Sequence, residues 1–317
     1  MWPSNSGTDI DCICLTGPTA CGKTELALKL AKELPIEVVS MDSMLVYRGM
    51  DIGTAKPPVV VRQHVPHHLI DIIDVSDVYS AGRFVRDAGK SVVEIKDRGR
   101  LPLLVGGTHL YLRAFRDGIA NLPQADLAIR ARLDVEAAAE GWPALHERLA
   151  EIDPEAAKRI SPGDRQRIQR ALEVFELTGK SLTYQIRRPR AESSFSIKTF
   201  AVLPDDRDAL AERIEQRFDA MTKAGFVEEV EQFKGRGDLS PSIPAMRAVG
   251  YRQMWAYLDG EYSWTEARDR AVAATRQLAK RQLTSLRSDK LAECLPLSGK
   301  NFERTFVERV EAVLDAS

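Results

Sequence analysis

A glycine-rich octapeptide near the N-terminus restricts the fold more than any other part of this sequence. Residues 17–24 read Gly-Pro-Thr-Ala-Cys-Gly-Lys-Thr and match the phosphate-binding pattern G-x-x-x-x-G-K-[ST]. An apolar stretch at 11–16 precedes them, and leucines and alanines at helical spacing follow at 25–34. The pattern is informative when it lies between a strand and a helix, and both are predicted here. The sequence therefore predicts a P-loop within an α/β sheet.

The residue types of this loop suit an anion. Glycines let backbone N–H groups converge on phosphate oxygens, and the start of the following helix adds partial positive charge. Lys23 supplies a mobile cation, and the hydroxyl of Thr24 can ligate Mg²⁺. We interpret Cys21 as a spacer in preference to a redox-active thiol. The predicted phosphate site comprises Gly17, Pro18, Thr19, Ala20, Cys21, Gly22, Lys23 and Thr24, with Thr24 as the metal ligand.

Strand-like and helix-like segments alternate through the first third of the chain. Strands are predicted at 11–16, 37–40, 68–73 and 101–105, and helices at 25–34 and 83–96. Such alternation is typical of βαβ units that build a parallel sheet covered on both faces.

The composition changes at residue 124, where helix formers begin to dominate. A strand is again predicted at 196–203, followed by helical periodicity at 206–233, a loop at 235–244 and further helix to the end. We therefore predict an α/β core formed by residues 1–123 and 196–317, with residues 124–195 as an all-helical insertion.

Composition and charge exclude several classes of protein. The chain is 44% hydrophobic with a net charge of −1, which is not the composition of a disordered protein. We expect no membrane span, because no apolar run approaches the ~20 residues that one requires. The N-terminal residues do not resemble a secretory signal. The four cysteines (Cys12, Cys14, Cys21, Cys294) form no paired C-x-x-C motif, so we expect free thiols and a cytoplasmic location.

The expected metal-positioning carboxylate of a nucleotide hydrolase is missing. The strand at 101–105 runs into Gly-Gly-Thr-His, which contains no acid, and this weakens an ATPase or GTPase interpretation. An acid instead follows the strand at 37–40, as Asp42. Because the carboxyl ends of strands line the ligand crevice of doubly wound sheets, we expect Asp42 and Thr108 to meet across the bound phosphate. The alternative is that Asp42 only caps its own loop.

Several segments, spread over most of the chain, together resemble the tRNA dimethylallyltransferases, also called tRNA isopentenyltransferases. They are residues 17–24, 42–57, 106–111, 166–170, 213–218, 247–252 and 280–287. The P-loop is generic, whereas the run Asp-Ser-Met-Leu-Val-Tyr-Arg-Gly-Met-Asp-Ile-Gly-Thr-Ala-Lys-Pro at 42–57 and the arginine-rich helix at 280–287 are specific. Cys21 and His109 depart from the usual family residues, but neither position carries a required chemical group.

This resemblance implies an activity and a set of partners. The activity is transfer of a dimethylallyl group from dimethylallyl diphosphate to N6 of adenosine-37 in tRNA, with release of diphosphate and with Mg²⁺ as cofactor. The implied fold is a P-loop NTPase-like parallel sheet with an inserted all-helical domain that binds the tRNA anticodon stem-loop. We expect the protein to act as a monomer.

The chemistry of this reaction suggests roles for three residues. Cleavage of the C–O bond leaves additional negative charge on the diphosphate, which the P-loop, Mg²⁺ and a further cation would stabilise. The resemblance selects Arg217 for that cation, with Arg213 one helical turn away; the alternative is that both lie on a solvated face. Asp42 would accept the N6 proton from a weakly nucleophilic amine, and Thr108 would be a second polar contact.

The resemblance also implies the residues that contact tRNA. They are Asp42, Ser43, Met44, Leu45, Thr108, Arg130, Gln166, Arg167, Ile168, Gln169, Arg170, Arg247, Gly250, Tyr251, Arg252, Lys280, Arg281, Gln282 and Arg287. Two stretches of the chain are basic although the total charge is near zero: residues 155–190 hold nine basic and four acidic residues, and residues 270–290 hold six and one. Such stretches suit a phosphate backbone.

Three other functions remain open from the sequence. A small-molecule or nucleotide kinase would share the P-loop, but it leaves the basic stretches and the missing strand-end acid unexplained. An RNA-binding regulator with an inactive phosphate loop does not explain an intact Lys23, Thr24 and Asp42. A prenyltransferase acting on free adenine nucleotides would not need the basic helical insertion.

Overall fold

The computed structural model describes residues 10–120, 122–188, 195–297 and 302–315. The chain divides into two compact units, Met1–Arg116 with Ser194–Ser317, and Asp117–Ser193. The predicted boundaries of the insertion, 124 and 195, differ from these by several residues. The difference at the first boundary arises because a non-helical connection precedes the first helix of the second unit, α5 (Leu127–Glu140).

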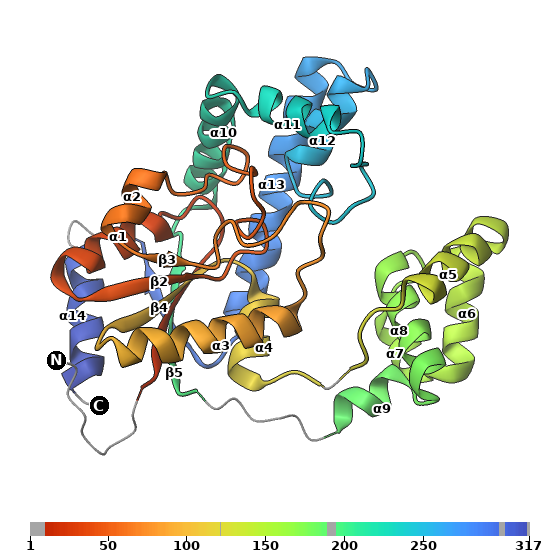
Figure 1. Cartoon of the computed structure of the whole chain (residues 1–317), viewed down its shortest axis with the longest axis horizontal. Helices are drawn as coiled ribbons and strands as arrows, with labels where there is room; N and C mark the ends of the chain where they lie inside the picture. The colour runs from red at the N-terminus through yellow and green to blue at the C-terminus, as the bar shows by residue number, and fades with distance from the viewer. Residues whose placement is uncertain (1–9, 121, 189–194, 298–301, 316–317) are drawn as a thin grey trace. The chain divides into compact units, whose positions relative to one another are not determined.

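The first unit is built on a sheet of six strands in the order β3-β2-β4-β1-β5-β6 (Figure 1). The strands are β1 (Cys12–Thr16), β2 (Ile36–Ser40), β3 (His67–His68), β4 (Leu101–Gly106), β5 (Ile197–Leu203) and β6 (Ala292–Pro296). Every pairing is parallel, so the carboxyl ends of all strands lie at one edge of the sheet. The central strand β1 pairs with β4 on one side and β5 on the other, which places the P-loop in the middle of that edge.

Helices cover both faces of this sheet. On one face lie α3 (Ala81–Asp97) and α4 (His109–Asp117), and on the other lie α1 (Lys23–Glu33) and α14 (Phe302–Asp315). Successive residues of a strand point to opposite faces, so Cys12 and Cys14 contribute to the first core and Ile13 and Leu15 to the second. Both cysteines are fully buried, and burial raises the pKa of the Cys14 thiol to about 12.

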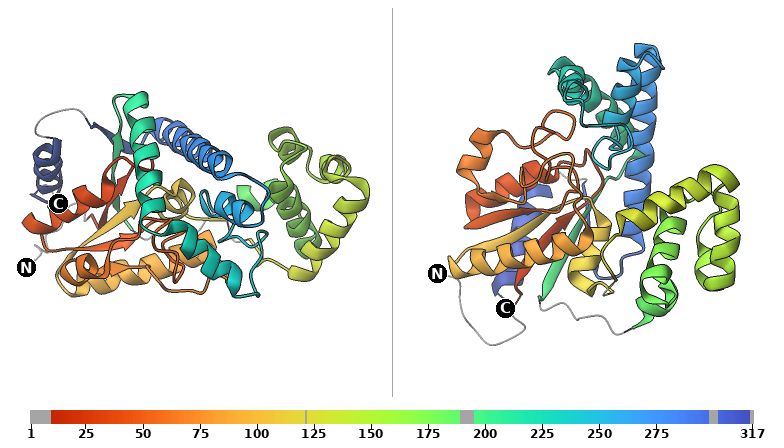
Figure 2. Two further views of the ribbon diagram at one scale, coloured as in Figure 1. Left: turned by 90° about the horizontal axis from the view of Figure 1, so that it is seen from above. Right: turned by 45° about the vertical axis from the view of Figure 1, so that its right-hand side comes forward.

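The remaining helices of this unit surround the carboxyl edge of the sheet. They are α2 (Val59–His64), α10 (Arg207–Lys223), α11 (Phe226–Gly235), α12 (Tyr251–Leu258) and α13 (Trp264–Arg287). Helices α10 and α13 lie side by side (Figure 2) and pack through Leu210, Ile214, Ala279 and Leu283. The helical periodicity predicted at 206–233 belongs to two helices, because Gly225 has a φ of 101° and interrupts the helical backbone.

Two secondary-structure predictions are wrong. The strand predicted at 68–73 is only the two-residue β3, because Leu69 and Asp71 have φ values of 61° and 57°, which an extended strand does not allow. The C-terminal region is not entirely helical, because β6 adds an edge strand beside β5 before α14 begins.

In the second unit, the described residues after 121 form five helices joined by short non-helical segments, with no strand among them. Helices α6 (Trp142–Ile152), α7 (Pro154–Arg159), α8 (Arg165–Thr178) and α9 (Leu182–Arg187) follow α5. Side chains of Asp126, Asp153, Asp164 and Ser181 cap the first turns of four of these helices. Leu133, Leu149 and Ile168 are fully buried and belong to a separate hydrophobic core. In the described part of the chain, no helix is long and apolar enough to cross a membrane.

Candidate active site

The predicted P-loop lies between the carboxyl end of β1 and the first turn of α1, and this prediction is confirmed. Gly22 precedes the helix with a φ of 81° and Ala20 has a φ of 62°, so the loop turns through the left-handed region twice. A Cβ on Gly17 would lie 2.7 Å from Cys21 Sγ and 2.8 Å from the carbonyl oxygen of Val202. The tight turn at position 17 therefore requires glycine.

The loop is arranged to receive an anion. The first-turn amides of α1 have no intrahelical partner, and they carry the positive end of the helix dipole. Lys23 folds back over the loop, where its Nζ donates to the carbonyl oxygen of Pro18 (2.7 Å) and lies 3.7 Å from Cys21 Sγ. Thr24 is exposed in the same turn. The ammonium group of Lys23 and the N-terminus of α1 thus face the same small cavity.

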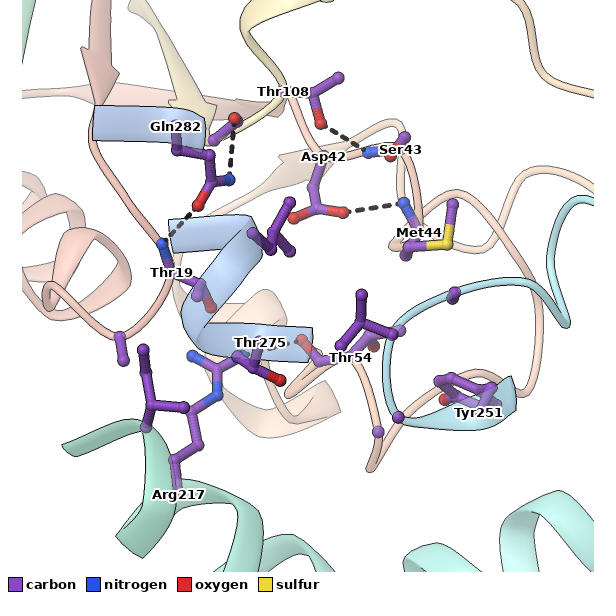
Figure 3. Close-up of a pocket in the computed structure, with 18 of the residues that line it drawn as sticks. Thr19, Asp42, Ser43, Met44, Thr54, Thr108, Arg217, Tyr251, Thr275 and Gln282 are labelled. Atoms are coloured by element: carbon purple, nitrogen blue, oxygen red, sulfur yellow. Dashed lines mark hydrogen bonds between the residues drawn. The ribbon is translucent and has the colours of Figure 1, made fainter. Parts of the chain in front are cut away.

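Asp42 and Thr108 come together beside the P-loop, as the strand arrangement predicts. Thr108 Oγ1 accepts a hydrogen bond from the N–H of Ser43 (3.1 Å), the residue after Asp42. Asp42 Oδ1 accepts from the N–H of Met44 (2.8 Å). Asp42 does cap its own loop, therefore, but it uses one carboxylate oxygen to do so and leaves the second facing the pocket (Figure 3).

Glycines at the end of β4 permit this close approach. A Cβ on Gly106 would lie 2.1 Å from the carbonyl oxygen of Met41, and one on Gly107 would lie 2.5 Å from Gln282 Nε2. Gly106 and Gly107 stand where a nucleotide hydrolase would carry an acid, and the close packing around them leaves no room for a larger side chain. This glycine pair lets the loops after β2 and β4 meet, and it lets α13 approach both.

The site consists of two adjoining compartments. The larger, of about 520 Å³, is lined by residues of α10, α13 and the segment 244–251 as well as the strand ends. The smaller, of about 100 Å³, contains Lys23 and Thr24. Six residues line both compartments and mark their junction: Thr19, Asp42, Thr54, Gly107, Arg217 and Gln282. The P-loop and the Asp42 carboxylate therefore face one continuous space.

Arg217 is the cation at this junction. It projects from α10, and its Nη2 lies 3.4 Å from the carbonyl oxygen of Thr54. Burial lowers the pKa of its guanidinium, and the nearby Asp42 carboxylate acts in the opposite direction. A guanidinium remains protonated under such conditions, so Arg217 brings a fixed positive charge to the pocket. Arg213, one turn earlier, is exposed and lines neither compartment.

Sequence reasoning missed Glu229, which holds the family-specific loop in place. Its carboxylate accepts hydrogen bonds from the N–H groups of Asp51 (2.9 Å), Ile52 (2.6 Å) and Gly53 (3.1 Å), and from the hydroxyl of Tyr251 (2.5 Å). Burial and this carboxylate raise the pKa of the Tyr251 phenol far above its ordinary value. An acid on the otherwise apolar buried face of α11 was the available sequence signal.

Lys56 secures the other end of that loop. Its buried ammonium donates to the carbonyl oxygen of Tyr47 (2.8 Å) and to carboxylate oxygens of Asp51 (2.6 Å) and Asp71 (2.5 Å). A Cβ on Gly53 would lie 2.1 Å from the ring of Phe226. Hydrogen bonds to Glu229 and Lys56 thus anchor the run at 51–57, which presents Thr54 to both compartments.

Some of the predicted tRNA contacts in the first unit are accessible and others are not. Exposed side chains are those of Arg247, Arg252, Lys280, Arg281 and Arg287. Ser43, Met44 and Leu45 are half-buried next to Asp42, whereas Gly250 and Tyr251 are buried. The Tyr251 hydroxyl binds Glu229, and the residue also lines the larger compartment, so its contact with tRNA stays a prediction. Gln282 is half-buried, and its side-chain amide bridges two backbone groups.

The predicted tRNA contacts of the second unit also differ in accessibility. Ile168 is fully buried in its core, so its predicted RNA contact is wrong. Arg130 and Arg170 both bind the buried carboxylate of Glu173, at 2.8 Å and 2.6 Å, and Gln169 Nε2 donates to Asp134 Oδ1 (2.8 Å). Of the stretch 166–170, the exposed side chains are those of Gln166 and Arg167. The basic residue Arg190 lies outside the described residues.

The two basic stretches are partly neutralised by local ion pairs. Arg270 pairs with Glu266 (2.8 Å) and Arg276 with Glu215 (3.0 Å). The exposed bases Lys280, Arg281 and Arg287 lie further along α13. The cationic surface of this helix is therefore concentrated toward its C-terminal half.

The donor set of the smaller compartment fits Mg²⁺ bound together with a phosphate ligand. Among the described residues, no group of three or more His, Cys, Asp or Glu side chains could by itself hold a metal ion. Mg²⁺ commonly takes one or two protein oxygens, substrate phosphates and water. Thr24 supplies a hydroxyl, and Ser40 Oγ is a buried hydroxyl with no hydrogen-bond partner in the described structure.

A six-stranded parallel sheet with a P-loop at the carboxyl end of its central strand defines a P-loop NTPase-like fold, here with an inserted helical unit. A family model described as IPP transferase matches residues 45–289. The tRNA dimethylallyltransferase of Cupriavidus necator is 53% identical over 292 residues, which is 90% of this chain and 91% of the relative. The chain therefore belongs to the IPP transferase family.

Solved structures agree with this assignment. The full-length tRNA isopentenylpyrophosphate transferase from Bacillus halodurans is similar with a TM-score of 0.70 and 37% identity, over 97% of each chain. A eukaryotic dimethylallyltransferase, determined acting on tRNA, gives a TM-score of 0.76 and 25% identity over 96% of this chain and 78% of its own.

Proposed function

We propose that this protein transfers a dimethylallyl group from dimethylallyl diphosphate to N6 of adenosine-37 in tRNA and releases diphosphate. The observation that carries this proposal is the junction of the two compartments, where the P-loop and Arg217 face the Asp42 carboxylate. Family membership supports this activity in preference to the kinase alternative. The strand-end acid expected of a nucleotide hydrolase is replaced by Gly106 and Gly107.

The smaller compartment would hold the diphosphate. As the bond between carbon C1 and oxygen breaks, its electron pair leaves with the diphosphate, and the charge is met by the P-loop amides, Lys23 and Arg217. The P-loop amides and Arg217 are held in place before the reaction, so they would stabilise the leaving group without reorganising. Mg²⁺ held by Thr24 and the diphosphate would supply further charge neutralisation.

Asp42 would receive the proton from N6 as the nitrogen bonds to C1. Its Oδ1 is held by the N–H of Met44, which orients the second oxygen toward the pocket. The hydroxyl of Thr108 accepts from Ser43 and can donate its own proton to a phosphate or base acceptor. Positioned acid–base groups of this kind contribute about 10²–10⁴ in rate.

The larger compartment would receive the adenine. A base in a stacked loop must swing out to reach Asp42, which costs a few kcal/mol that pocket contacts offset. Arg247 and Arg281 line this compartment and are exposed, so they can meet RNA phosphates at its mouth. We assign the helical unit, with exposed Gln166 and Arg167, to the anticodon stem-loop.

We further infer that the protein acts as a monomer in the cytoplasm. Cys12, Cys14 and Cys21 are buried free thiols, which suits a reducing compartment.

One labelling experiment tests the proposed function. The protein is incubated with Mg²⁺, dimethylallyl diphosphate labelled in its prenyl group, and either unmodified tRNA or AMP. We expect label in tRNA and none in AMP. Label in AMP alone would favour the free-nucleotide enzyme, and label in neither acceptor would contradict the proposal.

A further inference from the structure

Gln282 joins two parts of the active site that are distant in the sequence. From α13, its Oε1 accepts a hydrogen bond from the backbone N–H of Thr19 (2.9 Å), and its Nε2 donates to the carbonyl oxygen of Gly107 (2.9 Å). Figure 3 shows both bonds at the edge of the pocket. One side-chain amide thus spans the P-loop and the turn after β4.

One of the two backbone groups bound by Gln282 belongs to the proposed diphosphate site, and the other lies next to the loops of Thr108 and Asp42. Thr19 is the third residue of the P-loop, where the diphosphate would bind. Gly107 precedes Thr108, whose Oγ1 accepts from the N–H of Ser43 beside Asp42. The phosphate loop is therefore connected to the loop that carries the proposed base by the two hydrogen bonds of Gln282, the chain from Gly107 to Thr108, and the hydrogen bond between Thr108 and Ser43.

Both polar atoms of Gln282 are occupied by these bonds, and the residue is half-buried. Its neighbours Lys280 and Arg281 are exposed, so the RNA-facing and P-loop-facing residues of α13 are adjacent but distinct. The glycine at position 107 is required for this contact, because a Cβ there would lie 2.5 Å from Gln282 Nε2. The environment is that of a structural link and not of a base-reading side chain.

We propose that Gln282 is a positioning residue that sets the P-loop relative to the Asp42 and Thr108 loops, and that it does not contact RNA. The assignment of these loops to the reaction rests on the proposed function. The link itself rests only on the geometry of the P-loop, the β4 turn and α13. Loss of the amide would let the P-loop relax away from the arrangement that binds diphosphate.

The test uses Gln282→Met, which keeps the length of the side chain and removes both hydrogen bonds. Binding of inorganic pyrophosphate with Mg²⁺ is measured without RNA, and binding of tRNA is measured without diphosphate. We expect the pyrophosphate Kd to rise about five- to tenfold, which is the scale of one or two lost hydrogen bonds. We expect the tRNA Kd to stay within about twofold, because no RNA contact is removed. In turnover assays, the KM for dimethylallyl diphosphate should rise and the KM for tRNA should not.

Two further variants make the result unambiguous. Gln277→Met, on the exposed side of the same helix, should leave both binding constants unchanged. Gln282→Asn keeps the amide but is one methylene shorter, too short to span both partners, and should reproduce the effect of Gln282→Met even if the latter unfolds.

The opposite pattern, weaker tRNA binding with unchanged pyrophosphate binding, would overturn the proposal and restore Gln282 as an RNA contact. Unchanged binding of both ligands would also overturn it. If the protein failed to prenylate RNA, the pyrophosphate measurement would still report on the link, so failure of the proposed function can be told apart.

Discussion

The carboxylate of Glu229 and the hydroxyl of Tyr251 lie 2.5 Å apart, and the same carboxylate receives three consecutive backbone N–H groups from residues 51–53. The loop that presents Thr54 to the pocket is therefore fixed by a residue far away in the sequence. Two helices, α11 and α12, contribute to this anchor, so it links the packing of the fold to the geometry of the site.

We predict that Glu229→Gln destabilises the protein substantially. A glutamine retains only one acceptor oxygen, and its NH₂ group would face donors in a buried position. Leaving buried donors without an acceptor costs about 1–3 kcal/mol per group, so we expect a loss of about 2–4 kcal/mol in the free energy of unfolding. Tyr251→Phe, which removes a single bond, should cost about 1 kcal/mol. Denaturant unfolding measures both, and equal stability of Glu229→Gln and wild type would contradict the anchor.

Asp42→Asn tests the proposed base while preserving the loop. The asparagine oxygen can still accept from the N–H of Met44, but the side chain can no longer take a proton. We expect kcat to fall by about 10²–10⁴ with little change in pyrophosphate affinity. Single-turnover kinetics with labelled donor measure this effect. A variant with near-normal kcat would remove Asp42 from the chemistry.

Arg217→Gln should weaken diphosphate binding. It removes the cation that lines both compartments, and hydrogen bonds to charged groups are worth about 1.5–3 kcal/mol, so we expect the pyrophosphate Kd to rise about tenfold or more. Arg213→Gln is the matched control, since that side chain is exposed on the same helix and lines neither compartment. Equal effects of the two substitutions would show that Arg217 acts only through the net charge of α10.

The affinity for tRNA should fall steeply with salt. Each neutralised phosphate contributes about −0.7 to −0.9 to the slope of log affinity against log salt, so Arg281→Ala should make the slope shallower by about that amount. Arg304→Ala, on the opposite face of the sheet in α14 and paired with Glu308, is the control and should leave the slope unchanged. Titrations at several salt concentrations give both slopes, and a flat response in wild type would exclude the basic surface as the RNA site.

The helical unit should lose stability at acidic pH through Glu173. Burial acts to raise the pKa of this carboxyl, but hydrogen bonds from Arg130, Arg170 and the N–H of Asp126 outweigh it and hold the pKa below its ordinary value. Because the pKa of Glu173 is lower in the folded state, its ionised form stabilises the fold at pH values above the unfolded-state pKa of about 4.3. This stabilisation is lost as the pH falls through the folded-state pKa.

Hydrogen exchange of residues 127–187 in the full chain, followed as the pH falls below 5, measures this loss. Glu173→Gln should reduce the stability of the unit by about 2–3 kcal/mol near pH 7, because it leaves two arginines without their carboxylate while Arg130 keeps partial access to water. It should also flatten the pH dependence. An unchanged pH dependence in that variant would assign the acid sensitivity to other carboxyls.

The parts of the site that could be predicted from sequence are those fixed by local rules. The P-loop is a contiguous motif between a strand and a helix, and Asp42 and Thr108 follow strands whose carboxyl ends must meet in a parallel sheet. Glu229 and the bridging role of Gln282 could not be found in this way, because their partners lie 176 and 263 residues away in the chain.

The errors have equally local causes. Ile168 falls inside a segment that matches the family, but its position on the helix places it in the same hydrophobic core as Leu133 and Leu172. The strand predicted at 68–73 is cut short because Leu69 and Asp71 adopt a positive φ, which the apolar pattern of this segment does not reveal. Edge strand β6 is as long as β1 and β2 but largely exposed or half-buried, so its apolar pattern is weaker than theirs.

The most direct measurement follows both products of a single turnover with dimethylallyl diphosphate and unmodified tRNA. Quenched samples are assayed for free pyrophosphate and for the nucleoside at position 37 by mass spectrometry. We predict equimolar pyrophosphate and N6-dimethylallyl adenosine, both lost in Asp42→Asn. Consumption of ATP with phosphoryl transfer and no alkylated adenine would contradict it.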